Sequence, residues 1–566
     1  MRRRRPTTVR PRPAGGALAR RSRPVRLAVL AVAAVLVGGA ACAPAPDDAP
    51  APSASATGLR AEVLRTMRTA TAFMTDDVAY RGGYLWSYLP DGSRQFGEME
   101  AYPTQIWIQP PGTATMGHVY LDAYHATGDE AYYDAAAEVA EALMAAQHPA
   151  GGWNYLHDFA GEESLQRWYD TIGRNGWRLE EFQHHDGSAT FDDAGTAESS
   201  QLLLRMYLEK EDAAFRPALD RAIDFVLDSQ HPVGGWPQRY PLAPGTPDYA
   251  RDITFNDDVA AENIELLLMV HQALGDESVL PAVRAAMDAF VVTQQPAPQA
   301  GWSLQHDADD LRPVGARSYE PESLATHTTA GNVEKLLGFY ELTGDASYLA
   351  GVPAALDWLD SVRLPEALWT EDGRQFPTFV ELGTNDALFV HRTGSDVVNG
   401  RYWADKDPAR TIVHYNAFRA IDVPALRERY ATLRALPVEE ATAGSPLLHR
   451  GATLPEYFST GDVSVSDLNV GTLHRTDGVP TEDEVQEVLD ALGPDGYWPT
   501  PLVSTSNPYA GDGSPTPAAG DFGQTEVGGP TDTSPYTTDD PVTGISTGRY
   551  IEHMSTLLRW VADADA

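Results

Sequence analysis

The chain has 566 residues, of which 43% are hydrophobic and 9% are aromatic, so it can bury a substantial core. Its 80 acidic residues outnumber its 42 basic residues and give a formal net charge of −38. Because nucleic-acid binding needs a basic surface, this excess of acid argues against a nucleic-acid partner. An anionic ligand would need a local arginine cluster or a bound cation to overcome the overall field.

Residues 1–41 are predicted to form a signal peptide. Ten arginines and no acid lie within residues 1–26, and the apolar run LAVLAVAAVLV follows from Leu27 to Val37. That run suits the core of a signal peptide and is short for a membrane span. We therefore expect export, and loss of the leader would leave 32 basic residues against the 80 acidic ones.

Cys42 is the only cysteine, and it directly follows the small residues GGAA. A cysteine at such a cleavage site resembles the lipidation site of bacterial lipoproteins, although Gly39 stands where Leu is usual. We expect either a cell-surface protein held by a lipid on Cys42 or a secreted protein. Residues 42–58 are rich in Pro, Ala and Ser and are predicted to be a linker.

A repeated pattern follows the linker. Five Gly- or Pro-rich loops each end in a tryptophan, at Trp153, Trp236, Trp302, Trp369 and Trp498. The first four tryptophans follow an acid-rich turn by 24, 24, 26 and 24 residues, and these turns contain Asp129, Asp212, Asp276 and Asp345. Such regular spacing indicates an internal structural repeat.

Each repeat is predicted to be a pair of helices, because apolar residues recur at intervals of three and four on both sides of each acidic turn. The first helices are expected within residues 113–129, 198–212, 261–276 and 328–345, and the second within 132–147, 214–230, 279–294 and 348–362. Helix, tight turn, helix and long loop together predict an all-α fold, an (α/α) toroid. The long loops should emerge at one end and form a groove.

The predicted toroid domain spans residues 59–566, and we expect it to be a monomer. The helical pattern weakens after about residue 430. Residues 500–548 are rich in Gly, Pro, Ser, Thr and Asp and are predicted to form a long loop. A final amphipathic helix is predicted from Arg549 onwards, packed back onto the domain.

Two of the predicted loops carry acid pairs immediately before a helix. Asp192 and Asp193 lie in TFDDAGT, and Asp257 and Asp258 follow Asn256 in DITFNDD. Each pair on its own suits a helix N-cap. The pairs are 65 residues apart, about one repeat, so carboxylates of neighbouring units should meet at one rim. Converging oxygen ligands suit Ca²⁺.

Two further loops carry Arg317 and Arg392, in GARSYE and VHRTG. Either arginine could form an ordinary surface ion pair. The alternative is an anionic ligand, since the planar guanidinium group binds carboxylates through two hydrogen bonds.

Taken in order, these segments resemble the pectate lyases of polysaccharide lyase family 10. The resemblance rests on GGWPQRYPL followed by DITFNDD, on TFDDAGT, on QHD with LRPVGARSYEPES, and on FVELGTN followed by Phe and Arg392. The matching segments run collinearly from about residue 190 to residue 396. The family has an (α/α) toroid, as the repeat predicts independently.

The resemblance implies calcium-assisted β-elimination of polygalacturonate (pectate). It implies that Asp192 and Asp257 are the calcium-side residues, and that Arg317 and Arg392 grip the substrate, one of them removing the proton. Substrate contacts are expected from Gln238, Arg239, Gln305, His306 and Asp307. Calcium and arginine on the substrate carboxylate would stabilise charge that develops when the weakly acidic C5 proton leaves.

This chain departs from the family pattern at three places. Thr378 stands where the family usually has Arg, and Thr393-Gly394 follows Arg392 in place of Asp-Gly. The later Gly-Tyr-x-Trp segment is at most a remnant in Asn399–Trp403. These departures leave open a shifted substrate or a weak enzyme.

Two other functions remain possible from the sequence. A glycoside hydrolase on the same toroid would use Asp192, Asp257 or Glu320 as its acid and its base or nucleophile. A non-catalytic glycan-binding lipoprotein would use its tryptophan loops to stack sugars. Elimination differs from both, because it yields an unsaturated uronate that absorbs ultraviolet light.

Overall fold

The computed structural model describes residues 54–173, 180–183, 185, 187–244, 246–393, 401–412, 415–449, 478–505 and 536–564. The predicted signal peptide and Cys42 lie outside the described residues. Residues 54–566 cluster into one compact unit. None of the described helices has the length and apolarity needed to cross a bilayer.

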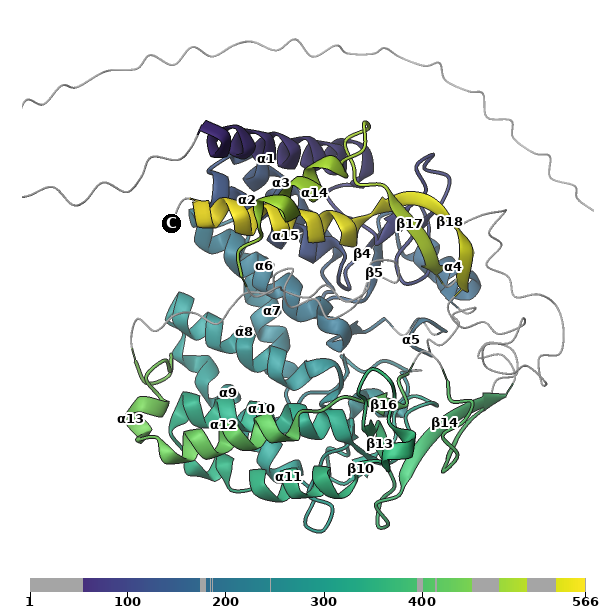
Figure 1. Cartoon of the computed structure of the whole chain (residues 1–566), viewed down its shortest axis with the longest axis vertical. Helices are drawn as coiled ribbons and strands as arrows, with labels where there is room; N and C mark the ends of the chain where they lie inside the picture. The colour runs from purple at the N-terminus through teal and green to yellow at the C-terminus, as the bar shows by residue number, and fades with distance from the viewer. Residues whose placement is uncertain are drawn as a thin grey trace, which may run out of the picture. The chain divides into compact units, whose positions relative to one another are not determined.

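The predicted helix pairs are confirmed. They are α2 (Thr113–Thr127) with α3 (Glu130–Ala146), α6 (Gly195–Lys210) with α7 (Arg216–Ser229), α8 (Val259–Leu274) with α9 (Leu280–Thr293), and α10 (Thr326–Thr343) with α11 (Val352–Ser361). The first helices of successive pairs pack together, α2 on α6 and α6 on α8. Helix α12 (Val423–Ala435) continues the series against α10 and α11. This is the repeated-pair architecture of an (α/α) toroid (Figure 1).

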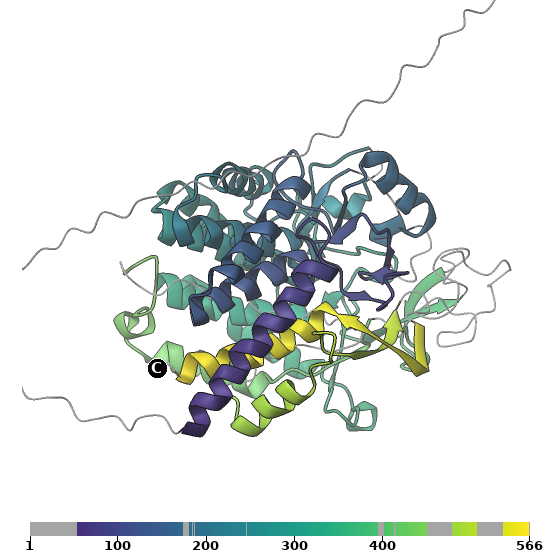
Figure 2. The ribbon, with the colours of Figure 1, turned by 90° about the horizontal axis from the view of Figure 1, so that it is seen from above.

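Helices from both ends of the domain pack side by side. Helix α1 (Ala54–Phe73) contacts α14 (Glu482–Asp490) and α15 (Thr547–Ala564), and α15 also packs on α2. Figure 2 shows α1 crossing α15. The predicted final helix is therefore confirmed. Helix α1 begins at Ala54, so the predicted linker is shorter than residues 42–58.

The prediction of a continuous loop over residues 500–548 is wrong at both ends. Strands β17 (Thr500–Thr505) and β18 (Tyr536–Ser546) form an antiparallel pair, and β18 also pairs with β1 (Ser87–Tyr88). The resulting sheet has the order β17-β18-β1-β2-β3, with β2 at Gln95–Phe96 and β3 at Glu100–Ala101. Composition alone missed these strands because Thr, Val and Tyr at the two ends are good strand formers.

The remaining strands are short and lie in the loops between helices, at the right in Figure 1. They are β4 (Gln105–Trp107), β5 (Leu156–Asp158), β6 (Ala189–Thr190), β7 (Arg239–Tyr240), β8 (Ile253–Thr254), β9 (Gln305–His306), β10 (Pro313–Val314), β11 (Leu324–Ala325), β12 (Phe376–Pro377), β13 (Phe379–Val380), β14 (Ala387–Thr393), β15 (Arg401–Asp405) and β16 (Phe418–Arg419). Antiparallel pairs such as β6 with β7 and β8 with β9 join one loop to the next. Neighbouring repeats are therefore linked at the loop end.

Short helices complete the structure. The α-helices among them are α4 (Glu162–Thr171), α5 (Glu180–Gln183) and α13 (Val438–Ala441), and η1 (Met74–Val78) is a π-helix. The 3₁₀ turns are η3 (Asp192–Ala194), η4 (Asp248–Arg251), η5 (Asn256–Asp258), η6 (Glu277–Val279), η7 (Ala346–Leu349) and η8 (Glu366–Leu368).

The repeated tryptophans are structural. Trp153, Trp236 and Trp302 are completely buried, and their indole N–H groups donate to Leu143 O at 2.8 Å, Val226 O at 2.8 Å and Phe290 O at 2.9 Å. Each indole thereby satisfies a carbonyl near the C-terminus of the preceding helix, where partners within the helix run out. Trp369 differs, because it is 38% exposed.

The two Gly-Gly-Trp loops need their first glycine. Gly151 and Gly234 have φ angles of +116° and +108°, a region that other residues avoid. A Cβ at Gly234 would also lie 1.8 Å from Ala285 O, and one at Gly151 would lie 2.0 Å from Arg221 O. Each loop therefore lies directly on the backbone of the second helix of the following pair, α7 for Gly151 and α9 for Gly234.

Candidate functional site

The two acid loops occupy equivalent places in neighbouring repeats. Strand β8, turn η5 and helix α8 each begin 64 residues after β6, η3 and α6. Both turns contain two consecutive left-handed residues, Asp193 and Ala194 at φ 51° and 57°, and Asp257 and Asp258 at φ 50° and 53°. The repeat of 64 makes Asp193 the counterpart of Asp257, and Asn256 the counterpart of Asp192. The 65-residue spacing inferred from the sequence was therefore one residue too long.

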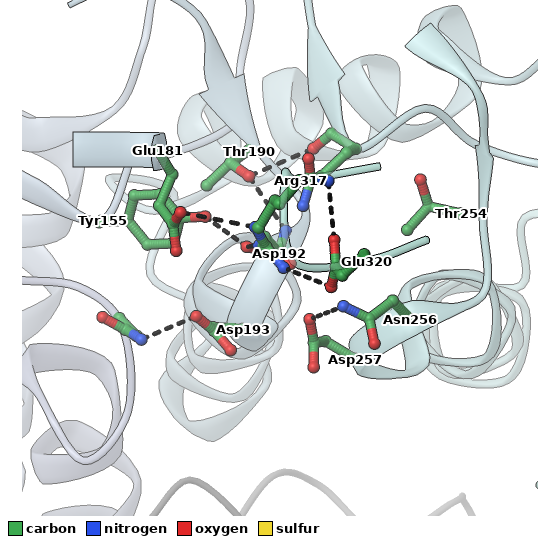
Figure 3. A network of polar contacts seen from close by, with 12 residues as sticks. Tyr155, Glu181, Thr190, Asp192, Asp193, Thr254, Asn256, Asp257, Arg317 and Glu320 are labelled. Atoms are coloured by element: carbon green, nitrogen blue, oxygen red, sulfur yellow. Dashed lines mark hydrogen bonds and ion pairs between the residues drawn. The ribbon is translucent and has the colours of Figure 1, made fainter. Parts of the chain in front are cut away.

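Asp192 is completely buried at the centre of a polar network (Figure 3). Its Oδ2 accepts hydrogen bonds from the Tyr155 hydroxyl and from Arg317 Nη2. Its Oδ1 is buried and accepts no hydrogen bond from any residue that the structure describes. Burial opposes the charge, but Arg317 holds the pKa of Asp192 below its ordinary value, so the residue is a carboxylate.

Arg317 is enclosed by three acids from different segments. Besides Asp192, its Nη1 donates to Glu320 Oε1 at 3.2 Å, and its Nε lies 3.5 Å from Glu181 Oε2. The backbone N–H of Arg317 donates to Glu320 Oε2 at 3.0 Å. The side chain is only 6% exposed. Burial opposes its charge, but Asp192 and the other acids raise its pKa well above the ordinary value.

Two more acids extend the network towards solvent. Asp257 is exposed, and its Oδ2 accepts a hydrogen bond from Asn256 Nδ2 at 2.6 Å. Asp193 Oδ2 accepts from Gln109 Nε2 at 2.8 Å. The pKa values of Asp193 and Asp257 are raised. The larger cause is the loss of hydration of the charged carboxylates, and the second is repulsion from Asp192. A positive charge placed among these carboxylates would relieve that repulsion.

The donor chemistry fits calcium only in part. Asp192 Oδ1 and the exposed Asp257 carboxylate are oxygen donors of the kind that calcium prefers. In the part of the chain that the structure describes, no group of three or more His, Cys, Asp or Glu side chains could hold a metal ion. A calcium ion here would need further oxygen ligands, for which a carboxylate of the substrate or water is suitable.

The predicted contact residues Gln238 and Arg239 lie beside Asp192. Strand β7 pairs Arg239 with Thr190, and the guanidinium of Arg239 lies 5.2 Å from the ring centre of Tyr155. The side chain of Gln238 helps to lower the pKa of Asp192, after Arg317 and other neighbours. Both side chains are buried, at 3% and 5% exposed.

The predicted contact residues Gln305, His306 and Asp307 lie on or next to β9, which pairs with the β8 strand that precedes Asp257. Gln305 Nε2 donates to Thr254 Oγ1 at 3.0 Å, and its Oε1 is buried without a partner. His306 Nε2 accepts from Ser303 N, and Nδ1 donates to Leu311 O, both at 3.0 Å. Neither ring nitrogen is therefore open to a ligand.

Asp307 holds its own turn. Its Oδ1 accepts hydrogen bonds from the backbone N–H groups of Asp309 at 2.8 Å and Asp310 at 3.2 Å. Among Gln305, His306 and Asp307, Gln305 alone keeps a buried side-chain oxygen that accepts no hydrogen bond from any described residue.

Arg392 is joined to the network through tyrosines. It is buried on β14, opposite Tyr402 on β15, and its guanidinium lies 6.0 Å from the centre of the Tyr402 ring. Tyr402 packs against Tyr319, which packs against Tyr415. Tyr415 in turn donates its hydroxyl hydrogen to Glu320 Oε1 at 3.2 Å. These contacts connect Arg392 to Glu320, which also binds Arg317.

Sequence reasoning missed Tyr155, Glu181 and Gln109. Tyr155 follows a repeated tryptophan, and Glu181 belongs to no repeat, so neither position stands out. Their contacts with Asp192, Arg317 and Asp193 join residues far apart in the chain. The sequence indicates Glu320 only as a candidate glycoside hydrolase residue.

The segment that carries the site matches a known family model. Residues 165–399 match the model described as pectic acid lyase. This segment is therefore similar to the pectic acid lyases. It contains Asp192, Asp257, Arg317 and Arg392, and the match supports a polysaccharide lyase. No curated protein is detectably similar to the chain.

Solved structures with similarity include two family 10 polysaccharide lyases from Cellvibrio cellulosa. A mutant in complex with trigalacturonic acid is 21% identical, with a TM-score of 0.36, over 49% of this chain and 94% of its own. A second structure is 20% identical, with a TM-score of 0.34, over 58% and 91%. A D-mannose isomerase is 12% identical, with a TM-score of 0.37, over 60% and 79%. At these TM-scores, the assignment rests on the family model.

Proposed function

We propose that the protein is a pectate lyase that cleaves α-1,4-polygalacturonate by β-elimination and releases unsaturated oligogalacturonates. The observation that carries the proposal is the buried Arg317 held between Asp192 and Glu320, beside the exposed carboxylate of Asp257, within the pectic acid lyase segment. One cation and several acids from separate repeats meet at the loop end. This arrangement suits a substrate that is a chain of carboxylates.

The reaction needs a positive environment for one carboxylate and a base for the C5 proton beside it. Arg317 stays charged, because its three acid neighbours stabilise the cation, so it is suited to stabilise the charge that develops on the substrate. Asp192 and Glu320 fix its orientation. Calcium, when bound near Asp192 and Asp257, would supply further positive charge to the same carboxylate.

The base is assigned to Arg392 in this proposal. Arginine is protonated at neutral pH, so its use as a base requires alkaline conditions or a strongly cationic neighbour. Arg392 is buried beside Tyr402, whereas the acids Glu181, Asp192 and Glu320 surround Arg317. We therefore expect activity to rise with pH above neutrality.

The deciding experiment follows ultraviolet absorbance of polygalacturonate with calcium, and then with EDTA added. The wild type should generate the absorbing product, and EDTA should stop it. Arg392→Ala should lose activity while keeping its melting temperature. Release of reducing ends without absorbance would instead show hydrolysis, and binding without turnover at any pH would show a glycan-binding protein.

The protein is further proposed to act outside the cell as a monomer. The arginine-rich leader, the apolar run before Cys42 and the Pro/Ala/Ser segment after it support export and a lipid anchor. Polygalacturonate is a polymer too large to enter a cell readily, so an exported enzyme suits it.

A further inference from the structure

Arg419 is a half-buried arginine near the site. It belongs neither to the repeat nor to the predicted site residues. It lies on β16, where it pairs with Phe376 of β12, and its backbone O accepts from Gln375 N at 3.0 Å. Its Nε donates to Thr378 Oγ1 at 3.0 Å, and its guanidinium lies 5.7 Å from the centre of the Tyr415 ring. The backbone, the hydroxyl and the ring together fix the direction of the side chain.

The charge of Arg419 has no partner among the described residues. Its terminal nitrogens make no hydrogen bond there, and no described carboxylate lies within ion-pair distance. Two of the buried arginines, Arg317 and Arg205, each bind at least one carboxylate, and the nearby Arg374 lies 2.8 Å from Asp372. In a chain with 80 acidic residues, a half-buried guanidinium without an acid is unexpected.

Arg419 is connected to the network of Asp192 and Arg317 through Tyr415. The Tyr415 ring beneath it donates its hydroxyl hydrogen to Glu320, which binds Arg317. Arg419 also interacts electrostatically with Asp257, although the two form no ion pair. Burial lowers the pKa of Arg419, followed by repulsion from Arg374, and such a group gains stability from a bound anion.

Thr378 explains why the guanidinium is in this place. Its hydroxyl donates to Asn416 O and accepts from Arg419, so it fixes the arginine of another strand. Thr378 is also the position at which the chain departs from the family pattern by lacking an arginine. The guanidinium of Arg419 on β16 therefore contacts Thr378, the residue that stands where the family usually has an arginine.

We propose that Arg419 binds a carboxylate of the uronate substrate through its two terminal nitrogens, and so supplies the cation that position 378 lacks. The inference deepens the proposed function and rests on it for the identity of the substrate. The planar fork of a guanidinium matches a carboxylate, and a neutral or methyl-esterified sugar would not make the same pair.

The test uses the mature enzyme and four forms of it: wild type, Arg419→Ala, Arg419→Lys and Arg427→Ala. Arg427 is the matched control, since it is an arginine on α12 whose ion pairs with Asp357 and Asp360 lie on the surface. Binding of trigalacturonate is measured by calorimetry, with and without calcium. The rate of ultraviolet-absorbing product is measured on polygalacturonate and on highly methyl-esterified pectin, and melting temperatures confirm folding.

Arg419→Ala should weaken trigalacturonate binding and raise KM for polygalacturonate by about tenfold or more, as loss of a charge-assisted pair predicts. Activity on methyl-esterified pectin should change much less, Arg419→Lys should fall between, and Arg427→Ala should match the wild type. Unchanged binding in Arg419→Ala, or equal losses on both polymers, would overturn the inference. If the wild type binds trigalacturonate through Arg419 but yields no unsaturated product, the proposed lyase activity is refuted and the inference about Arg419 stands. If the wild type does not bind trigalacturonate, both are refuted.

Discussion

At the scale of single residues, some acids of the site pair with an arginine and others do not. Asp192 and Arg317 form a buried ion pair, whereas Asp193 and Asp257 are repelled by the charge of Asp192. A buried ion pair contributes little net stability, but removal of one partner leaves an uncompensated charge and is costly. Mutations at the centre of this network should therefore affect both folding and chemistry.

Arg317→Ala should abolish activity and lower the free energy of unfolding by roughly 3–5 kcal/mol, because three buried acids lose their cation. Arg317→Lys should fold but lose most activity, since one ammonium group cannot reproduce the fork. Chemical unfolding and the ultraviolet assay measure the two effects. Adding Asp192→Asn to Arg317→Ala should recover part of the stability, and an Arg317→Ala protein as stable as wild type would contradict this account.

Asp252 gives a prediction for pH. Burial, and then repulsion from Asp307, raises its pKa from 3.8 to about 6. Since the folded state binds this proton more tightly than the unfolded state, the wild type loses stability as pH rises from about 4 to about 6. Asp252→Asn should therefore be more stable than wild type above about pH 6, by roughly 1–3 kcal/mol, and equal to it below about pH 4.

Denaturant titrations at pH 4 and pH 7 check this prediction. Asp228→Asn, at an exposed aspartate on α7, is the matched control. A stability gain of Asp252→Asn that is the same at both pH values would mean that the charge is not its cause.

At the scale of elements, the sequence predicted what depends on local pattern. The helix pairs followed from apolar spacing, and the acidic turns are N-caps, as when Asp129 accepts from Ala131 N and Asp345 from Ser347 N. The repeat of 64 could not be read from the acid pairs, because the left-handed turns align Asp257 with Asp193. The bonds of Tyr155 and Glu181 to this site depend on long-range packing, for which no local pattern exists.

Gly234→Ala tests the packing of a repeated loop. A methyl group there would meet Ala285 O and would demand a φ angle that alanine avoids, so stability should fall by roughly 2 kcal/mol or more. Gly338→Ala is the control, because that helical glycine has open space around its Cβ and should gain up to about 1 kcal/mol. Melting curves compare the two, and a neutral Gly234→Ala would show that the loop can move away from the helix.

At the scale of the whole molecule, the prediction concerns attachment. If Cys42 carries a lipid, the wild type should sediment with membranes and Cys42→Ser should be released in soluble form or keep its leader. Fractionation and mass spectrometry of the mature N-terminus measure this. Equal release of both proteins would establish a secreted enzyme and would leave the proposed reaction unaffected.

The contact between the first and last helices of the domain determines when the protein can finish folding. Thr71 and Tyr550 share a hydrogen bond of 2.7 Å across 479 residues, and Thr547 N donates to Trp86 O at 2.9 Å. Helices α1 and α2 therefore lack part of their packing surface until the C-terminus has been synthesised. Long-range closure of this kind is slow, because the entropy of a large loop must be lost first. If the chain is exported as proposed, its fold stays incomplete during synthesis, which is the state that a translocation channel for unfolded chains requires.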